Sequence, residues 1–363
     1  MKPEFKQGLE LCEAFFNEVA KPLLEAAFPV LRYSAGLIGY GSDVLGYDDA
    51  MSTDHMWGPR VHLFLPPKDF EAIRAQVAEV FATQFPYEFK GYSTHFSPPD
   101  PQDGGTRVRE TLQSGQVDPL IEYHTPSSFF QDYLGWDPGT EPTLQQWLTM
   151  PEQRLLGATS GRMFQDDLEI DALRGRLSYF PHDVWLWLMA SQWKMIAEEE
   201  PFTGRCGIAG DEIGSRIVAA RQVQRLMRLA FLMEKRYAPY SKWLGTAFKR
   251  LSAADRLIPL FDQILNAWHW QARDEHLGTA YTLLAQRHNA LDLTEPLSTG
   301  TTPFFTRPFH VISGERFTKA LHELIRDPWL QSLPPVGSVS QLTDSVTMYD
   351  DVLLSKKLAI LYQ

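Results

Sequence analysis

The hydrophobic periodicity of this 363-residue chain changes character once, within about residues 135–150. Before that point, short alternating segments typical of strands are mixed with helical patterns and with loops rich in Gly, Pro and Asp. After about residue 143, three- and four-residue apolar spacings dominate, as in helices that pack on one another. We therefore expect an α+β protein in which a small mixed-sheet domain precedes a larger all-α domain.

Within the first part, apolar residues alternate or form short blocks in four segments that we expect to be strands or strand-like, at residues 33–38, 61–65, 87–96 and 120–124. Helical spacing marks residues 5–23, where Pro22 is expected to kink or divide the helix, and residues 70–81. Thr125 followed by Pro126 predicts the start of a further helix, because threonine caps helices and proline suits their first position.

In the second part the expected helices cover six segments, at residues 168–178, 182–199, 211–236, 252–269, 272–290 and 314–326. Asp211 is the expected cap of the third, whose apolar face should include Ile213 and Ile217. We expect an N-terminal helix in residues 1–27, an α/β domain in residues 28–140 and a helical C-terminal domain in residues 141–363.

Charge and composition exclude several classes of protein. The net charge of −11 lies wholly in residues 1–150, which carry 10 basic and 21 acidic side chains, so binding to a nucleic-acid backbone is not expected. Cys12 and Cys206 are too few for a disulfide scaffold. No apolar run approaches the roughly 20 residues that a bilayer span needs, and the first residues lack a signal-peptide core. We expect a cytoplasmic protein without a membrane partner.

The densest polar segment lies between two expected strands and contains Gly41-Ser42-Asp43, Asp48-Asp49 and Ser52-Thr53-Asp54-His55. A glycine beside a serine lets the backbone approach a phosphate, and nearby carboxylates are ligands for Mg²⁺. The alternative is a solvated acidic loop, because Gly, Ser and Asp are also ordinary turn residues. The segment fits neither a Walker loop nor a dinucleotide-binding fingerprint.

Glu122 lies on the expected strand 120–124, on the face opposite Ile121 and Tyr123. Such a carboxylate can serve as a metal ligand or as a general base, or it can be an exposed strand residue. His124 shares its face and suits either a supporting position near the site or a structural role. His55 and His62 are open to both interpretations.

Basic side chains of the helical part form a second group of candidates. Arg221, Arg225 and Arg228 are spaced so that they share one helix face, which suits either a triphosphate or pairing with acidic side chains. Lys242 lies among aromatic residues, where it can contact a phosphate or extend its stem over apolar surface.

Gly41-Ser42, a spacer and then Asp54 before the strand 61–65 resemble the superfamily of DNA polymerase beta and the aminoglycoside nucleotidyltransferases. Residues 41–65 more closely resemble a bacterial family of nucleotidyltransferase-like proteins with a domain of unknown function. That resemblance extends over nearly the whole chain, through segments 179–185, 204–207, 237–243 and 288–291.

The resemblance implies a nucleotidyltransferase-like α/β domain and a nucleoside triphosphate, such as ATP, that binds with Mg²⁺ in a cleft expected between this domain and the helical domain. Asp54 and Glu122 would be the catalytic and metal-binding residues. Gly41 and Ser42 would bind phosphate, together with Lys242, Arg221 and Arg225 from the helical part. The implied reaction transfers a nucleoside monophosphate to a hydroxyl of a small-molecule or protein acceptor.

One residue departs from the superfamily pattern. Where Asp-x-Asp is expected, the chain has Asp54-His55-Met56, and a thioether is a poor ligand for Mg²⁺. Asp54 and Glu122 alone would hold one ion at most, unless Asp43, Asp48 or Asp49 substitutes. The alternatives are therefore an active nucleotidyltransferase, a catalytically impaired nucleotide-binding or regulatory protein, and an antitoxin-like module that recognises a partner protein.

Overall fold

The computed structural model describes residues 4–68 and 70–363, which divide into two compact units. Unit 1 comprises the described residues up to Pro142 together with residues 154–178, and unit 2 comprises residues 143–153 and 179–363. Unit 1 contains a small mixed sheet, and unit 2 is built largely from helices, so the expected fold class is confirmed.

The domain bounds differ from those expected. The chain leaves unit 1 close to the expected boundary at residue 140, but residues 154–178 return to it. The cause is a strand outside the expected set, β6 (Arg162–Asp166), which pairs antiparallel with β1 (Ser34–Leu37) at the edge of the sheet. The helical residues 8–27 also belong to unit 1, because Leu11 and Phe15 are part of its core.

The sheet of unit 1 has the strand order β5-β2-β1-β6. Its central strand β2 (Arg60–Phe64) pairs antiparallel with β1 and parallel with β5 (Leu120–His124), so the strands expected at 33–38, 61–65 and 120–124 all form. The segment 87–96 forms a short hairpin, β3 (Glu88–Phe89) and β4 (Tyr92–Ser93), apart from this sheet.

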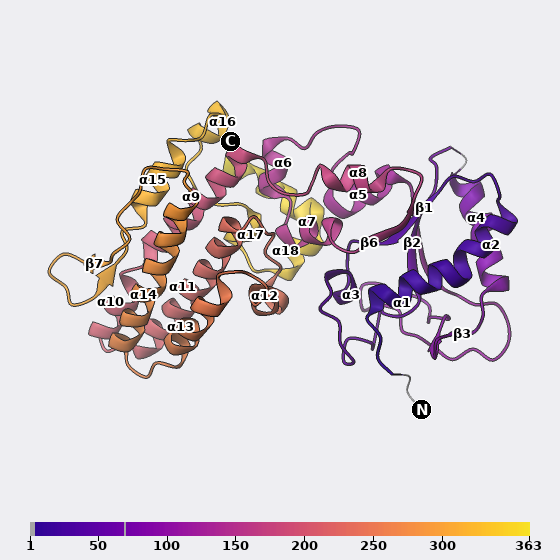
Figure 1. The fold of residues 1–363 in the computed structure, drawn as a ribbon, viewed down its shortest axis with the longest axis horizontal. Coiled ribbons are helices and arrows are strands. Elements are labelled where there is room, and N and C mark those ends of the chain that lie inside the picture. Colours follow the sequence, from indigo (N-terminus) through magenta and orange to yellow (C-terminus); the bar gives the residue numbers. More distant parts are fainter. Residues whose placement is uncertain (1–3, 69) are drawn as a thin grey trace. The chain divides into compact units, whose positions relative to one another are not determined.

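Several helices surround the sheet in unit 1 (Figure 1), and local sequence features explain two of their ends. Five π-helical residues, Phe16–Ala20, separate α1 (Gly8–Phe15) from α2 (Lys21–Ala27), just before Pro22 removes a backbone N–H. The other helices of this unit are α3 (Ser42–Leu45), α4 (Phe70–Gln84), α5 (Pro126–Leu134), α8 (Ile170–Gly175) and most of α7 (Glu152–Thr159). The Thr125 hydroxyl accepts from the Ser128 amide, as expected of a cap.

The two faces of β2 are both buried, against different partners. Val61 and Leu63 join the core that α1, α2 and α4 complete. Arg60, His62 and Phe64 point to the other face, where Phe129 of α5 packs on the rings of His62 and Phe64. Polar side chains on this second face are therefore enclosed by aromatic ones.

In unit 2, α9 (His182–Glu199) packs against α11 (Glu212–Met233) and α15 (Glu315–His322), while α11 and α13 (Ala254–Asn266) pack against α14 (Trp270–Ala290) (Figure 1). The shorter elements of this unit are α6 (Leu144–Thr149), α10 (Phe202–Ile208), α12 (Ser241–Phe248), β7 (Thr302–Pro303), β8 (His310–Val311), α16 (Pro328–Ser332), α17 (Val339–Leu342), α18 (Val346–Asp350), α19 (Val352–Lys357) and a 3₁₀ segment (Leu358–Tyr362).

The cap expected for α11 forms, since Asp211 accepts from the Gly214 amide. The apolar face predicted for its first turns is wrong: Ile213 is 73% and Ile217 59% exposed. Neighbouring helices instead bury Val218 and Gln222, because they pack on a face rotated from the one that hydrophobicity alone indicated. Among the described residues, no helix combines the length and apolar character needed to cross a membrane.

Candidate functional site

His62 and Glu122 are register partners on the parallel strands β2 and β5. His124 follows Glu122 by two residues and so lies on the same face of the sheet. Ile121 and Tyr123 point the opposite way, toward the apolar core, as the alternation predicted. Strand pairing thus brings two imidazoles and one carboxylate together on the aromatic face.

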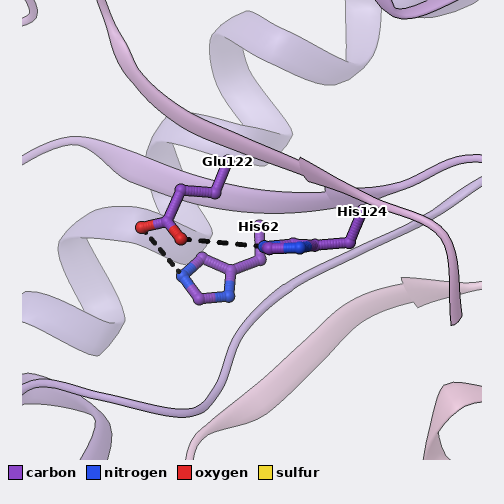
Figure 2. A group of neighbouring side chains, drawn as sticks. All are labelled: His62, Glu122 and His124. Carbon is purple, nitrogen blue, oxygen red and sulfur yellow. Dashed lines mark ion pairs between the residues drawn. The ribbon is translucent and has the colours of Figure 1, made fainter. Parts of the chain in front are cut away.

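The three side chains converge (Figure 2). His62 Nε2 lies 3.5 Å from Glu122 Oε1, and His124 Nε2 lies 3.7 Å from Glu122 Oε2. One potential ligand atom from each residue lies within 4.8 Å of the others. Within the described residues, His62, Glu122 and His124 form the group of three histidine, cysteine or acidic residues that lie close enough together to hold a metal ion.

Aromatic side chains surround this cluster. The ring of His62 lies 5.8 Å from that of Tyr40, 5.5 Å from that of His124 and 6.0 Å from that of Phe129. The Tyr40 hydroxyl donates a short hydrogen bond to Glu122 Oε1. The His62 side chain is 2% exposed and that of Glu122 is 30% exposed, so solvent reaches the cluster from the side of the carboxylate.

Protonation states follow from these contacts. Burial opposes ionisation of Glu122, but His62, His124 and the Tyr40 hydroxyl together hold the pKa of this carboxyl well below its usual range. Burial lowers the pKa of His62, although the Glu122 charge opposes that shift. A charged carboxylate beside a neutral imidazole is the arrangement in which both side chains can donate lone pairs.

The carboxylates of the acidic loop are held elsewhere. Asp43 is buried in an ion pair with Arg60, at 2.8 Å. Asp48 Oδ2 accepts from the backbone N–H of Gly8 at 2.7 Å and from Trp57 Nε1 at 3.0 Å. These contacts hold α1 and the loop against the sheet, so both aspartates stabilise the fold.

Asp49 and Asp54 lie near the surface. Asp49 accepts from the amide of Met51 within its own turn, at 2.8 Å. The Asp54 carboxylate, 69% exposed, pairs with the adjacent His55 at 3.0 Å. Among the described residues, the group of three potential metal ligands that contains Glu122 includes His62 and His124, and Asp54 is not a member of it.

Met56, at the position of the missing aspartate, bonds to Arg107. Its backbone N–H donates to the Arg107 carbonyl at 2.9 Å, and its Sδ accepts from the Arg107 amide at 3.2 Å. Met56 lines a cavity of about 460 Å³ together with Tyr40 and Glu122. The remaining lining comes from residues 104–107 and from Leu120 and Ile121.

Gly41 and Ser42 form the entry to α3. Gly41 has φ +119°, and a side chain there would collide with the Asp43 carboxylate and the Arg60 guanidinium. Glycine is thus required by the packing of the buried ion pair, whether or not the backbone also approaches a phosphate. Ser42 is the first residue of this four-residue helix and is half-buried.

The basic residues predicted in the helical part lie in unit 2. Arg221 and Arg225 both pair with Glu199 of α9, at 2.8 and 2.9 Å, and Arg228 pairs with Asp344 at 3.3 Å. Lys242 is exposed, and its ammonium lies 5.1 Å from the centre of the Trp243 ring. The three arginines Arg221, Arg225 and Arg228 therefore pair with acidic side chains of their own unit.

The donor set does not fit the Mg²⁺ centre that the superfamily resemblance implies. Mg²⁺ takes oxygen ligands in octahedral geometry, and a two-ion centre needs several carboxylates. Here Glu122 is accompanied by two imidazoles, while Asp43 and Asp48 are committed to structural contacts. Asp49 is held in its own turn and does not complete the set.

Sequence reasoning missed Tyr40 and Arg60 and left His62 and His124 undecided. His124 had a usable signal, its i+2 spacing from Glu122. His62 had none, because its place opposite Glu122 depends on the choice of β2 and β5 as neighbours and on their register. The position of Arg60 just before an apolar strand did not indicate its buried partner Asp43.

Comparisons with known proteins found a family profile that matches part of the chain and a solved structure that is similar to it. Residues 147–244 match a family profile described as a domain of unknown function (DUF4037), and they include the segments 179–185, 204–207 and 237–243 quoted for the closer resemblance. The chain is also similar to the crystal structure of a nucleotidyltransferase-like protein from Exiguobacterium sibiricum 255-15. Identity is 11%, coverage is 77% of this chain and 78% of that chain, and the TM-score is 0.32. No curated protein matches.

Proposed function

We propose that the protein is a nucleotidyltransferase-like protein that binds a nucleoside triphosphate without forming a Mg²⁺ centre for nucleotidyl transfer. The pattern from Gly41-Ser42 to Asp54 supports the nucleotidyltransferase-like kind. The observation that carries the rest is the state of the carboxylates: Asp43 is ion-paired with Arg60, and Met56 occupies the position of the second aspartate. Among the three alternatives, the state of these carboxylates favours the nucleotide-binding or regulatory protein over the active transferase.

The cavity beside Glu122 is the proposed nucleotide site. Its volume of about 460 Å³ lies in the range of small-molecule sites, roughly 300–1,000 Å³. Tyr40 and Leu120 supply apolar surface for a base, and Gly104 and Gly105 contribute backbone without side chains. Such a wall combines apolar surface with a few polar groups, as ligand sites commonly do.

The direct test measures the binding of ATP and of GTP by calorimetry, with and without Mg²⁺. We expect one nucleotide per chain and less than a twofold change in affinity when EDTA replaces Mg²⁺. Incubation with labelled triphosphates and a panel of metabolites or a lysate should give no transfer to any hydroxyl. Transfer by the native protein, or the absence of binding to either nucleotide, contradicts the proposal.

Met56→Asp probes the missing carboxylate, and Met56→Leu is the matched control. The aspartate adds a carboxylate to the cavity that Glu122 lines, so nucleotide binding should become Mg²⁺-dependent, with at least tenfold tighter binding when Mg²⁺ is present. Met56→Leu should bind as the native protein does. If Met56→Asp leaves binding independent of Mg²⁺, position 56 does not account for the missing centre.

Lys242 is the unit 2 side chain that we expect, from the sequence, to bind phosphate. Its ammonium is exposed, whereas Arg221 and Arg225 share the Glu199 carboxylate. Lys242→Gln should weaken triphosphate binding several-fold and leave nucleoside binding unchanged, because only the phosphates interact with its charge. Arg221→Gln serves as the control and should leave both affinities unchanged. Equal triphosphate affinity in the native protein and in Lys242→Gln would mean that Lys242 does not bind phosphate.

A further inference from the structure

We propose that His62, Glu122 and His124 form a binding site for a transition-metal dication of the Zn²⁺ class. The site is built from two neighbouring strands, with His62 on β2 and the other two residues on β5 (Figure 2). This ligand set differs from the all-oxygen Mg²⁺ centre that the superfamily resemblance implies.

The distances agree with a shared ion. Zn²⁺ bonds to imidazole nitrogen and carboxylate oxygen at about 2.0–2.2 Å, so ligand atoms on a tetrahedron are separated by about 3.4 Å. His62 Nε2 lies 3.5 Å from Glu122 Oε1 and His124 Nε2 lies 3.7 Å from the other oxygen, Oε2, while one potential ligand atom from each of the three side chains lies within 4.8 Å of the others. Small side-chain adjustments would complete the coordination.

Several ring nitrogens of the two histidines have no hydrogen-bond partner among the described residues. Within the described residues, neither ring nitrogen of His62 has a hydrogen-bond partner, and the same holds for Nε2 of His124. His62 is almost fully buried, and an unsatisfied polar atom in that position destabilises a fold. An ion bound to Nε2 of both histidines satisfies these two Nε2 atoms and offsets the Glu122 charge.

The chemistry of the donors selects the class of metal. Imidazole nitrogen suits Zn²⁺ and its first-row neighbours, whereas Mg²⁺ takes oxygen ligands. Two histidines and one glutamate are the protein ligands of several catalytic zinc sites, which leave a further coordination position for water or substrate. Of the three proposed ligands, Glu122 also lines the cavity of about 460 Å³.

Tyr40 acts as a positioning residue in this site. Its hydroxyl donates to Glu122 Oε1, which fixes the orientation of the carboxylate. The Arg60 guanidinium lies 4.8 Å from the centre of the Tyr40 ring and donates to the Tyr40 carbonyl at 2.9 Å. Outer contacts of this kind commonly change metal affinity by 10–100-fold.

Metal binding to the full chain tests the proposal, with any polyhistidine tag removed and in the absence of nucleotide. After dialysis against EDTA and then buffer, the protein is titrated with Zn²⁺, Co²⁺ and Mg²⁺ by calorimetry, and Co²⁺ binding is also followed by visible absorption. We expect one Zn²⁺ or Co²⁺ per chain and at least 100-fold weaker binding of Mg²⁺. No Zn²⁺ binding, or equal binding of Mg²⁺, overturns the proposal.

Glu122→Gln and His124→Gln should each weaken Zn²⁺ binding at least 100-fold, and Tyr40→Phe about tenfold. The exposed pair Asp54 and His55 provides the matched control, so Asp54→Asn and His55→Gln should bind Zn²⁺ as the native chain does. Circular dichroism checks the fold of each variant. Retained Zn²⁺ binding in folded Glu122→Gln and His124→Gln, or its loss in the Asp54 and His55 controls, assigns the metal to other residues.

Discussion

Arg60 and Asp43 form an ion pair in which each side chain is only 1% exposed. Arg60 Nε and one terminal nitrogen donate to the two carboxylate oxygens at 3.1 and 2.8 Å, a bidentate arrangement. The pair connects β2 to the start of α3, directly beside Tyr40 and Gly41. Because both Asp43 oxygens accept hydrogen bonds from Arg60, this aspartate of the acidic loop is committed to the ion pair and is not among the proposed metal ligands.

Asp43→Ala should destabilise the protein by about 3–5 kcal/mol, because it leaves the Arg60 guanidinium buried without its partner. Urea unfolding measures the change. The control is Asp54→Ala, in an exposed pair, with an expected cost below about 1 kcal/mol. The double variant Arg60→Met with Asp43→Leu should be more stable than Asp43→Ala. A cost for Asp43→Ala no larger than that for Asp54→Ala contradicts the structural role.

Gly41→Ala and Gly245→Ala should change stability in opposite directions. At Gly41 the positive φ and the nearby Asp43–Arg60 pair leave no room for a methyl group, so we expect a loss of about 1–3 kcal/mol. Gly245 lies within α12 with nothing near its Cβ position, and alanine there should stabilise by about 0.5–1 kcal/mol. Thermal unfolding compares the two. If Gly41→Ala leaves the stability unchanged, the prediction is wrong and the loop can adapt to the added methyl group.

His288 should make the protein less stable in mild acid. Burial beside Trp193 and Phe317 lowers the pKa of His288 to about 4, whereas the unfolded chain binds this proton near pH 6.5. Below pH 6.5 the unfolded state binds more protons, so stability falls as the pH drops from about 6.5 to about 4. The expected contribution over this range is about 3 kcal/mol.

Urea unfolding at several pH values measures this contribution, with His288→Phe as the comparison. The variant should lose less stability than the native protein between pH 6.5 and 4, because phenylalanine cannot take up a proton. Parallel stability curves for the two proteins are the contrary result.

Arg225 and Arg221 should differ in their importance for stability although both pair with Glu199. Arg225 is 18% exposed and also donates to the Met195 carbonyl, so Arg225→Ala should cost about 1–3 kcal/mol. Arg221 is 47% exposed, and Arg221→Ala should cost less than about 0.5 kcal/mol. Denaturant titrations of both variants make the comparison. Equal costs mean that burial does not distinguish the two contacts.

The local features of the sequence predicted much of the local structure. Alternation placed β5 at Leu120–His124 and set Glu122 and His124 on one face of it. The caps at Thr125 and Asp211 form because each depends only on side chains and amides a few residues apart. The prediction of the apolar face of α11 was wrong because local spacing does not indicate which side of a helix its neighbours cover. Ile213 is exposed, since the other helices pack on a different face of α11.

The sequence by itself determined the fold class, most strand and helix positions, and the placement of Glu122 on the face of its strand opposite Ile121 and Tyr123. The tertiary structure alone decided which residues meet. His62 lies opposite Glu122 because β2 and β5 pair in parallel. The 55 residues between these strands are long enough to permit other strand partners and other registers, so the sequence did not specify this pairing. The same long-range packing paired Asp43 with Arg60 and left Asp54 at the surface. Local periodicity cannot specify such contacts, since their free energy comes from burial and pairing between segments distant in the chain.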